Sequence, residues 1–314
     1  MKKLILDLDT GIDDTLAMSL AMASPEVELI GIIGTYGNVY MDQGLRNDLA
    51  ITDLFGKDVK VYRGLEHALK KDSFEVMEVS SFIHGKNGIG ECRIPDTKRR
   101  PEEISGIDFL IDSAHKYKED LIYVPTGPLT NLAAALQKDP SISSLIGRVV
   151  FMGGALTVPG NVSDWSEANI NQDPDAADYV VKHINTTMIG LDVTLQTLLT
   201  TRETAKWREL GTERAKFLAD VTDYYIKAYE VTAPGLGGCG LHDPLAVGVA
   251  INPDLVECLP INLMVETEPP LRGRTIGDLS MLSDPVKKTL VAVRVKRSSS
   301  STCWFPGFPP CPPD

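Results

Sequence analysis

The amino-acid sequence predicts an α/β fold, with a mostly parallel central sheet flanked by helices in a single domain. Residues 4–9 and 27–34 are apolar runs typical of short buried strands, and the Ala-, Leu- and Met-rich residues 16–22 between them are typical of a helix. Such a βαβ unit has parallel strands with helices on the faces of the sheet. In addition, 314 residues with 43% hydrophobic content can bury a large core.

Strand and helix patterns continue to alternate along the rest of the chain. The sequence predicts strands at 59–62, 120–124, 149–154, 187–194, 259–265 and 291–295, some of them including the exit loop, and helices at 42–55, 108–115, 132–137 and 203–230. Residues 64–100 form a long polar stretch that we expect to be a functional or mobile loop. Ligands of parallel sheets bind where strands end, so the loops after the strands are the first candidates for a site.

The charge of the chain limits its possible partners. The net charge is −12 and the pI is about 4.9, so neither nucleic acid nor an anionic membrane, which bind surfaces rich in Lys and Arg, is an expected partner. Met1-Lys2-Lys3 leads directly into the first strand, and no apolar run is long enough to cross a membrane. We therefore expect a soluble, cytoplasmic protein. The five scattered cysteines include no Cys-x-x-Cys pair and indicate reduced thiols rather than a zinc site or disulfides.

Four carboxylates lie at the first strand-to-helix junction. Asp7 and Asp9 are expected on one face of the strand, and Asp13 and Asp14 follow the turn that Gly11 permits. A single Asp there would most simply cap the helix. Four like charges at the end of a buried strand, however, repel one another unless a cation neutralises them. Oxygen ligands alone favour a hard cation, Ca²⁺ or Mg²⁺.

The run Asp7-x-Asp9-x-Gly11-x-Asp13-Asp14 resembles the N-terminal signature of the nucleoside hydrolases, the inosine-uridine-preferring family that cleaves N-ribosidic bonds using a bound Ca²⁺. Further segments are similar to motifs of this family and occur in its order. They are His84-Gly-x-x-Gly, the strand exit at Thr126, the segment with Asn161, Glu167 and Asn169, Gly190-Leu-Asp-Val-Thr194, and His242-Asp243. The resemblance covers about residues 4–295 and implies a ribonucleoside substrate and a homodimer or homotetramer.

The resemblance also implies a role for each motif residue. Ca²⁺ would be held by Asp9, Asp14, Asp243 and the backbone carbonyl of Thr126. Asp9 would also be the base that takes a proton from water, His242 the acid for the leaving base, and His84 its helper. Asp7 would support the cluster without binding the ion itself. The residues implied in substrate binding are Asp13, Asn38, Met152, Asn161, Glu167 and Asn169.

For some of these residues a purely structural role stays open. Asn38 alone would fit a left-handed turn position, and Tyr224, Tyr225 and Tyr229 at helical spacing are more typical of core packing than of substrate contacts. Asp173 before Pro174 is expected to cap a helix. The base preference is also open, although a histidine at 242 favours inosine-uridine-type and pyrimidine-preferring enzymes over the purine-specific group.

Two other functions are compatible with part of the sequence. Phosphatases of the haloacid dehalogenase type also begin with a strand and Asp-x-Asp-x-Thr, which Asp7, Asp9 and Thr10 resemble, although Thr10 follows Asp9 directly. A non-catalytic Ca²⁺- or sugar-binding module is the third possibility. We expect the hydrolase domain to span residues 1–297. Residues 298–314, rich in Ser and Pro, are expected to be a disordered tail or the product of an altered reading frame, where family members usually end in a helix.

Overall fold

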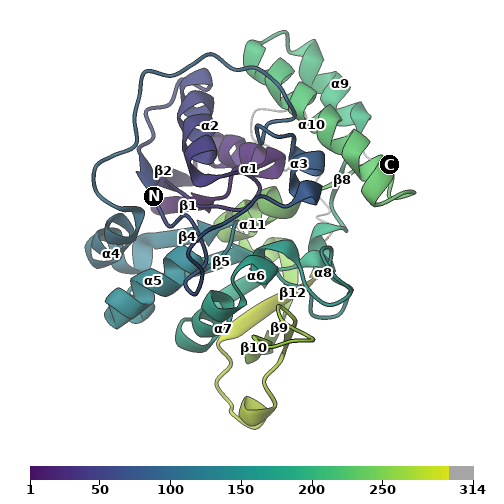
Figure 1. The fold of residues 1–314 in the computed structure, drawn as a ribbon. Coiled ribbons are helices and arrows are strands. Elements are labelled where there is room, and N and C mark those ends of the chain that lie inside the picture. Colours follow the sequence, from purple (N-terminus) through teal and green to yellow (C-terminus); the bar gives the residue numbers. More distant parts are fainter. Residues whose placement is uncertain (297–314) are drawn as a thin grey trace.

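The fold is built on an eight-stranded sheet within residues 1–296, the part of the chain that this computed structural model describes. The strand order is β3-β2-β1-β4-β5-β6-β12-β9; all neighbours are parallel except the edge strand β9, which is antiparallel to β12. This confirms the predicted fold class (Figure 1). The predicted tail of residues 298–314 lies outside the described residues.

The strands of this sheet are β1 Lys2–Leu8, β2 Val27–Gly34, β3 Val61–Arg63, β4 Leu121–Pro125, β5 Arg148–Met152, β6 Thr186–Ile189, β9 Val256–Ile261 and β12 Thr289–Val295. Two short antiparallel pairs accompany it, namely β7 Leu198–Leu199 with β8 Cys239–Gly240, and β10 Leu263–Val265 with β11 Thr275–Gly277. The helices are α1 Ile12–Ala23, α2 Met41–Leu54, α3 Glu78–His84, α4 Gly106–Tyr117, α5 Thr130–Lys138, α6 Ala168–Gln172, α7 Pro174–His183, α8 Leu191–Thr194, α9 Thr201–Glu209, α10 Glu213–Thr232 and α11 His242–Ile251. Short 3₁₀ turns are η1 Lys118–Asp120, η2 Pro140–Ser144, η3 Pro253–Leu255 and η4 Leu279–Met281.

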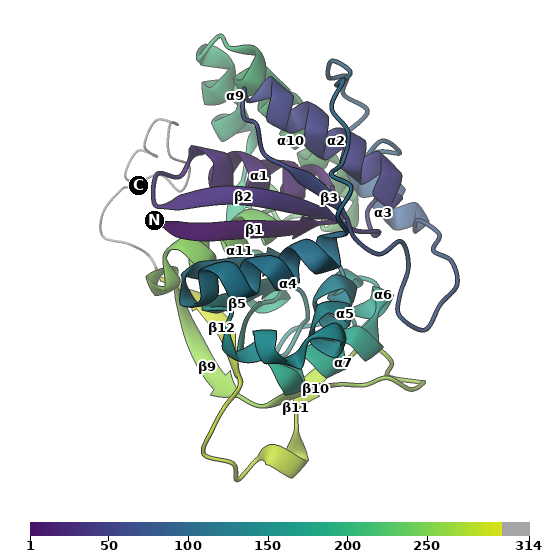
Figure 2. The ribbon, with the colours of Figure 1, turned by 90° about the vertical axis from the view of Figure 1, so that its left-hand side faces the viewer.

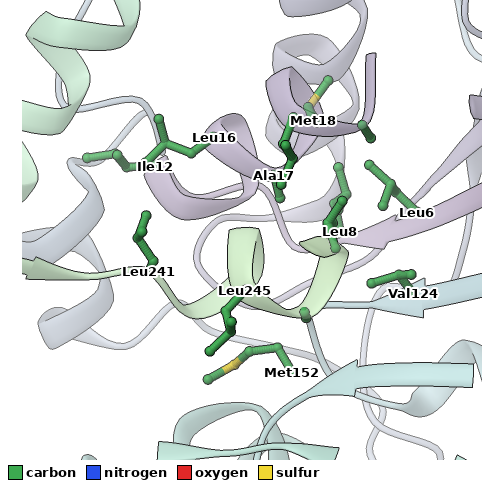
Figure 3. Packing of buried hydrophobic residues seen from close by; sticks show 14 of the residues in the cluster. Leu6, Leu8, Ile12, Leu16, Ala17, Met18, Val124, Met152, Leu241 and Leu245 are labelled. Carbon is green, nitrogen blue, oxygen red and sulfur yellow. The ribbon is translucent and has the colours of Figure 1, made fainter. Parts of the chain in front are cut away.

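Helices cover both faces of the sheet because its strands are apolar on both sides. Along β1, Leu6 and Leu8 pack in one apolar cluster with α1 and α11, whereas Ile5 packs in a second cluster with residues of α4, α5 and α7. Figure 3 shows the first cluster, in which α1 and α11 side chains meet the ends of the strands. Figure 2 shows α4 and α5 against the strands of the other face. The carboxyl end of β1 is therefore held rigidly from both sides.

Four predicted elements differ from the observed ones. Of the strand and exit predicted at 187–194, β6 takes only the first part, and Leu191–Thr194 form the short helix α8. The helix predicted at 203–230 is two helices, α9 and α10, which separate at Gly211, a residue with φ of 68° that is unfavourable for other residues. The predicted loop at 64–100 contains α3, which is too short to produce a clear helical periodicity. The strand predicted at 259–265 is divided between β9 in the main sheet and β10 in a small one.

Within the described residues, no helix is long and apolar enough to cross a membrane. Cys92, Cys239 and Cys258 are free thiols, as predicted for these three positions.

Candidate active site

The first part of the site is the turn between β1 and α1. Gly11 precedes α1, and a Cβ added to it would lie 2.5 Å from Nδ1 of His84 and 2.7 Å from Nδ2 of Asn38, so the close approach of these side chains requires glycine there. At the third position of α1, Asp14 Oδ2 accepts a hydrogen bond of 2.6 Å from the Gly11 N–H. Thr126 Oγ1 donates to the other Asp14 oxygen at 2.6 Å. Asp14 therefore caps its helix and joins β4 to the turn.

Asp9 follows β1 and is oriented by the loop after β2. Asn38 donates to Asp9 twice, from its backbone N–H at 2.9 Å and from its side-chain Nδ2 at 3.2 Å. The positive φ in this loop belongs to Gly37, not to Asn38, so the left-handed interpretation of Asn38 was wrong. A Cβ at Gly37 would lie 1.9 Å from Asp9 Oδ2, so only glycine lets the loop approach Asp9.

Asp7 lies inside β1 and faces away from the cavity described below. Its two oxygens accept hydrogen bonds from the Tyr123 hydroxyl on β4 and, at 2.9 Å, from Nδ2 of Asn131 on α5. Burial raises the pKa of Asp7 to about 7. Both carboxylate oxygens are thus engaged by other side chains, and the supporting role of Asp7 stays a prediction.

The loop after β5 and the start of α6 form another wall. Glu167 caps α6 and accepts from the N–H groups of Gly154, Asn169 and Ile170 at 2.9–3.1 Å. Asn169 Nδ2 donates to the backbone carbonyl of Thr126 at 2.6 Å and to that of Met152 at 3.2 Å. Asn161 is exposed at the rim, where its Oδ1 accepts from the Ala168 N–H. These amide and carboxylate groups are suited to hydroxyl ligands, which both donate and accept.

A histidine and tyrosine network forms the opposite wall. His242 is bonded through Nδ1 to Thr194 Oγ1 at 2.8 Å and through Nε2 to the Tyr229 hydroxyl at 2.5 Å. The Tyr225 hydroxyl donates to Asp13 Oδ2 at 3.2 Å, and its ring contacts the ring of Tyr229. Tyr225 and Tyr229 thus pack in or against the core, as expected, and also carry polar contacts at the site.

His84, at the end of α3, lies beside the carboxylate cluster as a neutral ring. Its Nδ1 accepts a hydrogen bond of 3.1 Å from the Ile12 N–H, so the ring proton is on Nε2. Nδ1 also lies 3.7 Å from Asp13 Oδ1, but a nitrogen that accepts from the backbone cannot pair with a carboxylate as a cation. In agreement, burial lowers the pKa of His84 to about 4.

These segments enclose a cavity of about 350 Å³, within the usual range for small-molecule sites. All six residues implied in substrate binding line it, together with both histidines, Thr126 and Asp243. The six are Asp13, Asn38, Met152, Asn161, Glu167 and Asn169. Asp7, Asp9 and Asp14 are not among the lining residues. The remaining wall is mostly apolar and comes from α3, α8 and α10, including Met77, Ile83 and Leu195.

The carboxylates at this cavity are buried close together. Oxygens of Asp13, Asp14 and Asp243 lie within 4.8 Å of one another, and each residue is at most 6% exposed. Burial, and then the charges of Asp14 and Asp13, raise the pKa of Asp9 well above its ordinary value. Burial and the neighbouring aspartates do the same to the pKa of Asp243. No Lys or Arg lines the cavity within the described residues. The negative charge of these carboxylates is therefore not balanced by a Lys or Arg among the described lining residues.

The donor set fits a hard metal cation. The cluster consists of oxygen atoms alone, and Asp13 Oδ1 is buried without a hydrogen-bond partner, so it has free capacity for a ligand. The structure groups Asp13, rather than Asp9, with Asp14 and Asp243, and both Asp9 oxygens accept hydrogen bonds from Asn38. The metal-ligand roles of Asp9 and of the Thr126 carbonyl stay predictions.

We expect Asp14 to leave a signature in the pH dependence of stability without metal. Burial and the Asp13 charge raise its pKa to about 6 from 3.8. The folded state then binds more protons than the unfolded chain between these values, so this group's contribution lowers the free energy of unfolding as pH rises. In urea unfolding with a chelator present, the free energy of unfolding should fall between about pH 4 and pH 7 in both proteins. The fall should be about 2 kcal/mol smaller for Asp14→Asn than for wild type. The lowered pKa of His84 has the opposite effect on the pH dependence of stability, but this effect is the same in both proteins and cancels in the comparison. Equal losses in both would contradict the raised pKa.

Comparison with known proteins identifies the family. The family description "Inosine-uridine preferring nucleoside hydrolase" matches residues 4–300. The chain belongs to this family. The nucleoside hydrolase fold and the predicted resemblance are thereby confirmed, and the protein is an N-ribosyl hydrolase that converts ribonucleosides to ribose and free base.

Relatives of this nucleoside hydrolase span nearly its whole length. The chain is 37% identical to a probable uridine nucleosidase 2 of Arabidopsis thaliana over 88% of this chain and 85% of that protein. It is 32% identical to the pyrimidine-specific ribonucleoside hydrolase RihB of Escherichia coli over 98% and 95% of the two chains. A solved purine-preferring ribonucleoside hydrolase from Gardnerella vaginalis is 66% identical, covers 94% of each chain and superposes with a TM-score of 0.93.

Family membership disfavours the two alternative functions, and the geometry agrees for the phosphatase. In that interpretation an aspartate of the Asp7-x-Asp9 pair would attack a phosphate. Asp7 is 1% exposed and does not line the cavity, and both its oxygens accept hydrogen bonds from neighbouring side chains. Asp7, the first carboxylate of the pair, therefore faces Tyr123 and Asn131 rather than the cavity.

The motifs gave no role to Thr194, and the spacing of the tyrosines did not distinguish Tyr225 and Tyr229 from Tyr224. Thr194 stands at the end of the Gly-Leu-Asp-Val-Thr run, which is similar to a family motif. The two tyrosines are four residues apart on α10, a spacing that puts them on one helix face. That spacing was visible, but which structure the face meets depends on the packing of α10 against α3 and α1.

Proposed function

We propose that this protein hydrolyses ribonucleosides with the help of one bound Ca²⁺. The observation that carries the proposal is the buried group of Asp13, Asp14 and Asp243, which opens onto a cavity without any Lys or Arg among its described lining residues. When bound, the ion would hold ribose hydroxyls and increase the acidity of a water molecule. Asp9, Asp14, Asp243 and the carbonyl of Thr126 are the proposed ligands, and Ca²⁺ prefers such oxygen donors.

On the ribose side, the residues of this chain orient the sugar and remove a proton. Asp9 takes the proton of the attacking water, and the two hydrogen bonds from Asn38 hold its carboxylate in one orientation. Asp13 Oδ1, which has no partner, accepts from a ribose hydroxyl. Asn169, Glu167, Asn161 and Met152 complete the sugar-binding wall. The transition state carries positive charge on the ribose, which the surrounding carboxylates stabilise.

On the other side, His242 delivers a proton to the departing base. The hydrogen bonds between its two ring nitrogens and the hydroxyls of Thr194 and Tyr229 orient its ring. Burial lowers the pKa of His242, so the ring is neutral before the reaction. As the N-ribosidic bond breaks, the ring gives its N–H proton to the base and takes a proton from the hydroxyl bonded to its other nitrogen, which water then replaces. His84, with its proton on Nε2, assists from the α3 side of the cavity.

We further propose a preference for purine ribonucleosides. The relative with 66% identity is titled purine-preferring, whereas the relatives with uridine or pyrimidine in their names are 37% and 32% identical. Pocket residues diverge with overall identity, so the nearer of these three relatives is the better guide. This proposal runs against the preference that His242 suggested in the sequence.

One assay series tests the metal and the base preference. Metal-stripped protein should release no ribose from nucleosides in excess chelator, and added Ca²⁺ should restore turnover. Turnover that persists in the chelator would overturn the metal assignment. With Ca²⁺, kcat/KM should be at least about 10-fold higher for inosine, guanosine and adenosine than for uridine and cytidine. The reverse order would overturn the purine preference while leaving the hydrolase intact.

A further inference from the structure

Asp48 on α2 is a buried acid that no step of the proposed mechanism uses. It is 0% exposed, and it does not line the cavity. Its Oδ1 accepts a hydrogen bond of 2.8 Å from Thr10 Oγ1, while its Oδ2 has no hydrogen-bond partner among the described residues. Burial, opposed by the Thr10 bond, raises the pKa of Asp48 well above its ordinary value. A buried acid is costly to keep, so its contact with Thr10 calls for an explanation.

Thr10 is the strained residue of the turn that carries the proposed metal ligands. Its φ is 30°, a conformation that a β-branched residue seldom adopts and that surrounding contacts must hold. It lies between Asp9 and Gly11, and Gly11 in turn donates to Asp14. A change in the Thr10 backbone would therefore move Asp9 and Asp14 relative to each other.

Helix α2 and the loop after α3 enclose Thr10. A Cβ at Gly44 of α2 would lie 3.1 Å from Thr10 Oγ1, and a Cβ at Gly88 would lie 2.6 Å from the Thr10 carbonyl oxygen. Both neighbours thus approach the turn closely enough to limit its movement. Within the described residues, Asp48 is the only group that the structure bonds to the Thr10 side chain. Asp48 is therefore placed to decide whether Thr10 keeps its strained conformation.

We propose that Asp48 is a positioning residue for the metal site and acts through the Thr10 hydroxyl. This inference rests on the proposed function, because it assumes that the carboxylates of this turn bind Ca²⁺. The Thr10–Asp48 hydrogen bond holds the turn in the conformation that gathers Asp9 and Asp14. Without it, the free turn relaxes, and Ca²⁺ binding must restore the strained conformation at the expense of affinity. Residues that orient metal ligands typically change metal affinity about 10- to 100-fold when they are replaced.

The test is a calorimetric titration of metal-stripped full-length variants with CaCl₂. Thr10→Val removes the hydroxyl at nearly constant shape, and Asp48→Ala removes the acceptor. We expect each to raise the Kd for Ca²⁺ about 10-fold. The double variant should bind no more weakly than either single variant, because both changes remove one interaction. Asp48→Asn keeps an oxygen that accepts from Thr10, so its Kd should stay close to that of wild type.

Thr52→Val is the matched control. Thr52 is a buried threonine one turn further along α2, where its hydroxyl donates to the Leu49 carbonyl at 2.9 Å. Its loss should lower the melting temperature and leave the Kd unchanged. If Thr10→Val and Asp48→Ala also lower only the melting temperature, Asp48 is structural and the inference is overturned. The inference would also be overturned if the two changes had additive effects on Ca²⁺ affinity in the double variant, or if Asp48→Asn bound Ca²⁺ as weakly as Asp48→Ala. A wild type that binds no Ca²⁺ would instead refute the proposed metal site, and this inference with it.

Discussion

Replacing Asp9 by alanine should lower kcat by about 10³-fold or more, and this is the largest effect that we expect from one side chain. The change removes the proposed base, whose contribution is typically about 10² to 10⁴ in rate, together with a metal ligand. The fold should survive. Asp9 is buried among Asp13 and Asp14, and both burial and their charges destabilise its ionised form, so the variant without metal should be at least as stable as wild type. Ribose release and urea unfolding in a chelator measure the two effects.

Asp254→Ala serves as the control for this experiment. Asp254 is exposed in the 3₁₀ turn η3, does not line the cavity, and should be replaceable without effect on turnover. A folded Asp9→Ala protein that keeps kcat within about tenfold of wild type would exclude Asp9 as the base, because so small a loss in kcat is less than general base catalysis contributes.

Replacing His242 by alanine should have an effect that depends on the leaving group. For inosine or uridine, whose bases need a proton to depart, we expect kcat to fall by about 10² to 10³-fold. For p-nitrophenyl riboside, whose phenolate leaves unaided, the loss should be at least about tenfold smaller. Tyr229→Phe, which removes the hydroxyl bonded to His242 Nε2, should show the same dependence in weaker form.

The exposed His183 on α7 provides the matched histidine-to-alanine control, and this variant should match wild type on both substrates. Equal losses on nucleoside and p-nitrophenyl riboside in His242→Ala would refute an acid role. Such a result would indicate that His242 only shapes the cavity together with Thr194 and Tyr229.

Much of the fold was predictable because its signals are local. The apolar runs that became β1, β2, β4, β5 and β6 each alternate with a helix, and this order requires parallel pairing. Pro174 after Asp173 predicted the start of α7, where the Asp173 side chain does accept from Ala176 N. Short elements such as α3 escaped prediction, because one or two turns carry too little periodicity.

The chemistry of the site was also visible in part. Four carboxylates at one junction indicated a cation, and family motifs indicated which distant segments would join them. The partners of each carboxylate were not visible. Asn38 bonds Asp9 although a left-handed turn seemed the simpler role, and Asp48 belongs to a helix that carries none of the family's motifs noted here.

The sequence by itself determined the fold class, the family and the residue types at the site, because periodicity and motif spacing are properties of neighbouring residues. Only the tertiary structure decided which aspartates meet, which of them carries an oxygen without a partner, and which nitrogen of His84 carries the ring proton. The physical reason is that hydrogen bonding and desolvation depend on distances between segments far apart in the chain. Those distances are set by how α1, α2, α10 and α11 pack around the strand ends, which no local pattern specifies.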